Sequence, residues 1–435
     1  MQKKEKYNSF WTYMIFCVIG FVIIYIPIPL TGKMYMYLDI GADTYCSYWL
    51  SLSYVADLAG DIKLWDTSLG LGASTLIQIC YFLIDPFNWI VFLFSPYNMD
   101  IGIFLSLCMK YIFLIIGSYL YFDIMELKGL SRNIAALCTT FCGWFVGWGQ
   151  HYNFASMFVM FIWLLYFFER WLKQKKWLGY VMLLAYISAM TVYYTYMSLL
   201  FLSIYYLVRY GTEFRDLGIK KFLIVSIQTA LICIIGIALA AVFFLPMVGD
   251  ITASARISEK LIPSLSFASI EEYISLVLRG FSSNIFGVNQ NFKGYVNYYE
   301  CPFMYVSLLL FFFIPQILRI KRHIVGFLLM VLALIFPGFV GVIFNAFSTM
   351  SYRWTFIFVP IFALGIGKGV SVWEENSRDL KTSKWSYAFI MCSIVAYCCY
   401  LMNQETVVIE RTAVISIVIV MVSSTLYLVV FNNNI

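Results

Sequence analysis

Charged residues are scarce in this chain. Lys, Arg, Asp and Glu make up 12% of its 435 residues, whereas 62% are hydrophobic and 20% are aromatic. An average soluble domain carries about 25% charged residues. The composition therefore excludes an ordinary soluble domain and predicts an all-α, polytopic membrane protein.

Metal motifs and disulfide frameworks are also lacking. His151 and His323 are the only two histidines, too few and too far apart for a histidine metal site. None of the eleven cysteines forms a Cys-x-x-Cys pair, and most lie in apolar runs, where cysteine acts as a small hydrophobic residue. The net charge of +6 comes largely from short loops, so it indicates membrane topology rather than nucleic-acid binding.

A cleavable signal is not expected either, because no small-residue cleavage site follows the long first apolar run. The helix at 11–30 is instead a signal anchor, and the basic residues before it place the N-terminus inside. We expect about twelve transmembrane helices, with both termini cytoplasmic. They are predicted at 11–30, 99–123, 133–149, 154–171, two within 178–208, 221–246, 300–318, 323–345, 353–369, 385–402 and 411–431.

The apolar stretch 178–208 determines the topology. As one helix it would be about 45 Å long, against about 30 Å for a bilayer core. It would also leave Arg209 and Arg215 outside. Two short spans that break near Thr191 to Tyr194 return these charges to the cytoplasm, so a hairpin is predicted.

The chain 1–435 is expected to form a single integral membrane domain with two long extracytoplasmic loops, 31–98 and 247–299. In the first loop, the apolar segments 46–58 and 75–95 are predicted to be interfacial or re-entrant helices, the second broken at Asp85-Pro86.

Polar residues gather at the predicted outer face. Asp39 and Asp43, four residues apart, follow the first span. They could hold Mg²⁺ or Mn²⁺ through oxygen ligands, or act as a base and a helix cap. Lys110 lies near the middle of a span, where a charge usually lines a cavity or binds something; snorkelling or pairing with an acid above it is the alternative.

Several short motifs resemble the YfhO-like family of bacterial membrane proteins in their order and spacing. They are Gly41-Ala42-Asp43, Tyr48-Trp49, Trp65, Gly70-Leu71-Gly72, Asp85-Pro86-Phe87-Asn88 through Ser95-Pro96, Lys110, Gly149 to Asn153, Tyr193 to Met197, Pro246, Arg256 and Tyr352-Arg353-Trp354. The resemblance covers most of the first 370 residues. Two departures are Asp85, where a small residue is expected, and the missing C-terminal extracytoplasmic domain of a family whose members are usually about twice as long.

The resemblance implies a GT-C fold in the bacterial cell membrane. It implies a glycosyltransferase that moves a sugar from a polyprenyl-phosphate donor to a cell-envelope polymer or lipid, with inversion. An inverting transfer needs a carboxylate to deprotonate the acceptor, for which Asp43 is the first candidate and Asp39 the second. The leaving phosphate needs a cation, for which Arg353 offers a planar fork, with Arg256 or Lys110 as a second cation.

Sugar contacts are expected from a hydrogen-bonding and stacking set: His151, Asn153, Tyr193, Tyr194 and Tyr196. A turn or an interfacial aromatic belt is the alternative for these residues.

Two other functions share these features. A lipid-linked saccharide flippase or exporter would carry polar residues through the membrane midplane. A surface polysaccharide polymerase or ligase would need arginine-bearing outer loops, and the 247–299 loop carries only Arg256 and Arg279.

Overall fold

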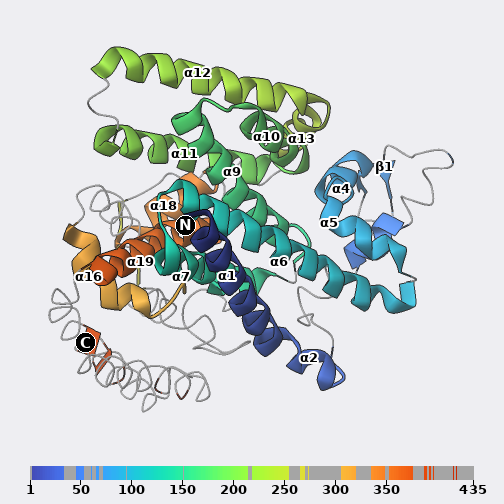
Figure 1. Cartoon of the computed structure of the whole chain (residues 1–435). Helices are drawn as coiled ribbons and strands as arrows, with labels where there is room; N and C mark the ends of the chain where they lie inside the picture. Colours follow the sequence, from blue (N-terminus) through green and yellow to red (C-terminus); the bar gives the residue numbers. More distant parts are fainter. Residues whose placement is uncertain are drawn as a thin grey trace. The chain divides into compact units, whose positions relative to one another are not determined.

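The computed structural model describes residues 2–33, 46–52, 60, 65–67, 72–94, 96–149, 151–213, 218–253, 265–269, 273, 305–319, 335–347 and 352–375, with a few positions between 387 and 418. Within these residues the fold is almost entirely helical (Figure 1). The chain divides into two compact units, residues 1–126 with 148–260, and residues 127–147 with 261–435.

The first unit contains most of the described helices. They are α1 (Gln2–Tyr25), α2 (Pro27–Leu30), α4 (Thr75–Phe82), α5 (Pro86–Trp89), α6 (Met99–Ile124), α9 (Phe154–Gln174), α10 (Leu178–Met190), α11 (Val192–Glu213), α12 (Gly218–Leu239) and α13 (Ala241–Ala253), with 3₁₀ turns η1 (Ile90–Leu93) and η2 (Pro96–Asn98). The strands β1 (Trp65–Asp66) and β2 (Ala73–Ser74) pair antiparallel, with Trp65 opposite Ser74.

Five described segments are long and apolar enough to cross a bilayer. They are Ser9–Leu30, Met99–Ile124, Phe154–Gln174, Gly218–Leu239 and Arg353–Glu375. The protein is therefore a predominantly helical membrane protein with several candidate spans. The total of about twelve spans, the single domain and the cytoplasmic position of both termini stay predictions.

The predicted helix break in 178–208 is present. Thr191 is extended, with φ −162°, and separates α10 from α11. Tyr180 near the start of α10 and Tyr205 near the end of α11 both pack on Phe168 of α9, with ring centroids 5.4 and 6.1 Å away. Because the start of α10 and the end of α11 both contact the Phe168 ring, the chain reverses direction at Thr191, as the hairpin interpretation requires.

The predicted break in 75–95 is also present, because α4 ends at Phe82 and α5 begins at Pro86. Asp85 precedes the proline as the N-cap of α5 and accepts a hydrogen bond from the Phe87 N–H at 3.0 Å. Proline at the first helical position needs no such acceptor, so this Asp-Pro pair starts the second helix of the segment.

Two expected spans are interrupted. Within 133–149, α7 (Gly129–Thr140) ends, and α8 (Gly143–Trp148) starts at Gly143, whose N–H donates to the Tyr305 carbonyl at 2.7 Å instead of continuing α7. Within 221–246, the helix breaks at Ala240 between α12 and α13. The turn lets α13 pack on α4 and α10, whereas α12 packs on α10.

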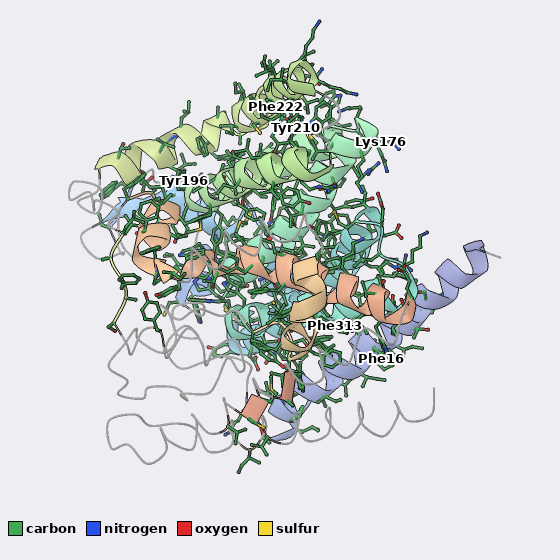
Figure 2. All side chains as sticks on the ribbon, turned by 90° about the vertical axis from the view of Figure 1, so that its left-hand side faces the viewer. Phe16, Lys176, Tyr196, Tyr210, Phe222 and Phe313 are labelled. Carbon is green, nitrogen blue, oxygen red and sulfur yellow. The ribbon has the colours of Figure 1, made fainter. Side chains whose placement is uncertain are left out.

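Aromatic side chains hold the helices of the first unit together. The Tyr13 hydroxyl of α1 donates to the Ile115 carbonyl of α6 at 3.1 Å. At the other side of the unit, Tyr210 of α11 meets Phe222 of α12 with ring centroids 4.3 Å apart, and Figure 2 labels both rings.

The second unit is built from α7, α8, α16 (Leu309–Arg319), α18 (Pro337–Phe344), the 3₁₀ turn η4 (Arg353–Ile357) and α19 (Phe358–Glu375). Helix α19 packs on both α7 and α16. A Cβ at Gly367 would lie 2.4 Å from Leu127 Cδ1 and 3.0 Å from Ala135 Cβ. This position therefore needs glycine, because the helices approach closely there.

Candidate functional site

A group of polar side chains is buried where the 75–98 segment meets the helices of the first unit. We call it the Asp85 cluster; its members are Tyr48, Asp85, Asn88, Ser106, Lys110, Ser156 and the half-buried Tyr186. Its members come from residues 46–52, from the α4–α5 break and α5, and from α6, α9 and α10. Such groups are costly in an apolar interior unless they are hydrogen-bonded or paired.

Asp85 is the centre of this cluster and is fully buried. Its Oδ1 accepts hydrogen bonds from the Phe87 N–H and from the Tyr186 hydroxyl of α10, both at 3.0 Å. Within the described part of the chain, Oδ2 accepts no hydrogen bond. Burial raises the pKa of the Asp85 carboxyl, and the nearby positive charge of Lys110 opposes that rise.

Lys110 is 2% exposed and lies in the middle of α6. Its Nζ donates to the Tyr152 carbonyl at 3.1 Å. Ser156, which also lies beside Asp85, donates to the same carbonyl at 3.0 Å. Because the charge of Lys110 lowers the pKa of Asp85, the lysine lies near an acid, in line with the pairing alternative. Its hydrogen bond to the Tyr152 carbonyl holds the turn that precedes α9.

The other side of the cluster is closed by Tyr48 and Asn88. The Tyr48 hydroxyl donates to Asn88 Oδ1 at 2.9 Å, and Asn88 Nδ2 donates to the Phe82 carbonyl at 3.0 Å. The Tyr48 and Tyr152 rings both contact Phe82, with centroids 4.4 and 4.9 Å away. Residues 46–52 and the turn before α9 are thus joined through the hairpin of α4 and α5.

His151 lies in that turn and is 7% exposed. Its Nδ1 accepts from the backbone N–H groups of Asn153 and Phe154, at 3.2 and 3.3 Å. Its ring is nearly parallel to those of Tyr152 and Phe154, with centroids 4.5 and 4.2 Å away. Since Nδ1 is an acceptor, a neutral His151 carries its proton on Nε2, and the side chain caps the start of α9.

The structure brings the 151–154 turn to the start of α11. The Phe154 ring lies 5.5 Å from that of Tyr194, which in turn lies 5.5 Å from Tyr193. Asn153 and Tyr194 are 0% and 2% exposed, whereas Tyr193 and Tyr196 are half-buried. Five of the predicted substrate and cation residues therefore share one neighbourhood: Lys110, His151, Asn153, Tyr193 and Tyr194.

Four of the other predicted site residues lie either outside the described residues or in the second unit. Asp39, Asp43 and Arg256 lie outside the described residues, and so does the candidate Mg²⁺ or Mn²⁺ position at the two acids. Arg353 opens η4 in the second unit, beside Trp354, which stacks on Phe344 at 5.3 Å. In the described ranges, no group of three or more His, Cys, Asp or Glu residues could hold a metal ion.

A second buried charge pair lies at the other end of α9. Glu169 is fully buried within the helix. Arg209 of α11 donates to both of its carboxylate oxygens, from Nε and Nη2, at 2.8 Å each, and the Tyr205 hydroxyl also donates to it. This bidentate pair ties α9 to the second helix of the hairpin.

Sequence reasoning gave no site role to Asn88, Ser156 and Tyr186, and it treated Asp85 only as part of a helix break and as a departure from a family pattern. One signal was available for the acid: a lysine in mid-span needs a compensating charge, and Asp85 is the acid in an otherwise apolar segment. For the three neutral residues no sequence signal exists, because their role depends on which helices pack together.

The fold and this site define a helical, multi-span membrane protein with a polar cluster buried inside its first unit. A family model described as bacterial membrane protein YfhO matches residues 55–434. The chain belongs to this family, which confirms the resemblance found in its motifs. No curated protein matches the chain, and no solved structure does.

Proposed function

We propose that this protein is an inverting membrane glycosyltransferase of the GT-C type. It takes a sugar from a polyprenyl-phosphate donor and passes it to a cell-envelope polymer or lipid at the extracytoplasmic face. The proposal is carried by one observation, the gathering of Lys110, His151, Asn153 and Tyr194 in one unit of a YfhO-family chain.

The chemistry assigns one role to each kind of residue. Asp43 deprotonates the acceptor hydroxyl as it attacks the anomeric carbon, with Asp39 as its neighbour. Arg353 stabilises the charge that develops on the leaving polyprenyl phosphate, since its planar fork matches phosphate oxygens. Lys110 is 2% exposed and donates a hydrogen bond to the Tyr152 carbonyl. Its role is therefore to hold the 151–154 turn, which carries the candidate sugar contacts, rather than to contact the phosphate.

A lipid-linked saccharide exporter is the second candidate, and one observation favours it. Buried charge is found both at the Asp85 cluster and at Glu169 near the other end of α9, as a polar path across the membrane would require. However, Arg209 saturates the Glu169 carboxylate with two hydrogen bonds. A carboxylate with both oxygens hydrogen-bonded to an arginine links two helices and is not available to bind the headgroup of a transported lipid.

The test is Asp43→Asn, which keeps the shape of the side chain and removes the basic carboxylate. Loss of a general base costs about 10²–10⁴ in rate. Transfer from a labelled polyprenyl-phosphate sugar to envelope acceptor should fall by that factor in membranes that contain normal amounts of the variant. Arg353→Lys should also fail, because lysine lacks the planar fork.

Asp39→Asn is the matched control for this experiment. If it alone abolished transfer while Asp43→Asn kept it, the base would be Asp39. Full transfer in both single variants and in the double variant would remove the mechanism, and the exporter would then be the better explanation. Measuring whether labelled donor crosses vesicles without being consumed separates the two functions directly.

A further inference from the structure

Four lysines from two separate segments of the chain lie at one end of the first unit. We call them the lysine patch: Lys175 and Lys176 directly follow α9, and Lys220 and Lys221 belong to the first turn of α12. All four are exposed. Their basic neighbours Lys173 and Arg209 are matched by Glu126 and Glu169, whereas no described residue forms an ion pair with any of the four.

Contacts between α9 and α12 hold the two pairs of lysines near each other. Trp171 of α9 donates from Nε1 to Thr229 Oγ1 of α12 at 3.0 Å. Lys175 Nζ lies over the Trp171 ring, 4.9 Å from its centroid. Figure 2 shows Lys176 at the same end of the unit as Phe222, the residue that follows Lys221.

This arrangement is electrostatically unfavourable without an anion. Partial burial and the like charge of Lys221 both lower the pKa of Lys175. Lys220 and Lys221 also lie in the first turn of a helix, where the macrodipole disfavours positive charge. A bound anion would relieve both effects at once.

Apolar side chains surround the lysine patch. Trp177, Leu178 and Ile219 are 46%, 62% and 68% exposed. Exposed tryptophan beside basic residues is typical of the membrane–water interface. A free phosphate ion in water would make no use of such a rim, whereas a lipid brings an anionic headgroup and acyl chains together.

We propose that the lysine patch binds the phosphate headgroup of an anionic phospholipid in the cytoplasmic leaflet. The headgroup lies between Lys175 and Lys221, and its chains run along the apolar surface of α12 beyond Ile219. The positive-inside rule places this end of α9 in the cytoplasm, where the leaflet is anionic and attracts basic segments. The inference does not depend on the proposed transferase activity.

The experiment compares lipid retention by purified full-length protein. Protein in mixed micelles is given equal amounts of phosphatidylglycerol and phosphatidylcholine, and bound lipid is measured by native mass spectrometry. Each lysine near an anionic surface contributes about a fivefold change in affinity. The Lys175→Gln/Lys221→Gln variant should therefore bind phosphatidylglycerol about 25-fold more weakly, with phosphatidylcholine unchanged.

The matched control is Lys33→Gln, which replaces another exposed lysine, located after α2, and should leave retention unchanged. Lys175→Arg/Lys221→Arg should also bind normally, because it keeps both charges. Equal retention by wild type and the Gln variant, both with normal thermal unfolding, would overturn the proposal. Stronger binding of polyprenyl phosphate than of phosphatidylglycerol would overturn the phospholipid assignment, and competition by inorganic phosphate alone would overturn a lipid site.

Discussion

Removing Arg209 while keeping Glu169 should destabilise the first unit more than any other single charge removal in it. Arg209→Met replaces the arginine by an unbranched apolar side chain and removes both guanidinium hydrogen bonds to Glu169, each 2.8 Å long. Among the residues that the structure describes, the Tyr205 hydroxyl is then the one donor that remains for the fully buried Glu169 carboxylate. Hydrogen bonds that involve ionised groups are the stronger ones.

The size of the effect follows from which charge is left behind. Breaking a buried pair by removing one partner costs about 3–5 kcal/mol, because an uncompensated charge remains in an apolar site. Replacing both charges by neutral groups of similar volume is often neutral. The double variant Glu169→Gln/Arg209→Met, in which Tyr205 still donates to the new amide oxygen, should therefore be more stable than Arg209→Met alone.

The measurement is a double-mutant cycle on the free energy of unfolding in detergent. The expected coupling between the two positions is about 2–3 kcal/mol. Arg170→Met is the matched control: Arg170 is the residue next to Glu169 and lies over the rings of Tyr166 and Phe167, 5.6 and 5.8 Å from their centroids. It should cost about 1 kcal/mol or less. Strictly additive losses in the cycle would refute the reasoning.

Three further predictions test topology, packing and the buried acid. In a background without other exposed cysteines, an impermeant thiol reagent applied outside should label Lys33→Cys but not Gly211→Cys; labelling at Gly211 would contradict the hairpin. Gly367→Ala should lower the unfolding temperature because a Cβ there meets a side chain at 2.4 Å, whereas Gly249→Ala, with no atom within 4 Å, should not. The pKa of Asp85 is raised in the folded protein, so the free energy of unfolding should fall as pH rises from the ordinary aspartate pKa through the raised pKa of the folded state. Asp85→Asn should remove this pH dependence of stability, and an unchanged dependence would exclude Asp85 as its source.

The class of the protein and much of its helix order could be predicted from composition and charge. Apolar runs with the right length predicted the spans at α6 and α9 nearly to the residue, because a helix that crosses lipid must satisfy its backbone internally and show apolar side chains along its length. The break near Thr191 was predicted because one long helix would have stranded Arg209 outside. These inferences use only local properties of the chain and the thickness of a bilayer.

The interruptions at Gly143 and Ala240 could not be predicted in the same way. Both segments are apolar enough to continue as single helices. Helix α7 does not continue through Gly143, because the Gly143 N–H donates to the Tyr305 carbonyl, 162 positions later in the chain. No pattern within a span indicates a partner at that distance.

The buried polar residues depend most on tertiary structure. For Lys110, pairing with an acid was only the alternative that the sequence left open, and packing decided that the acid near it is Asp85. Tyr186, whose hydroxyl donates to Asp85 across 101 positions of sequence, carried no signal of its own. In the same way, nothing in the sequence indicated that Arg209 of α11 would pair with Glu169 of α9. Hydropathy determines which segments enter the membrane, whereas the pairing of the few charges they carry is decided by which helix faces meet, because a buried charge is tolerated only where its partner is held in place.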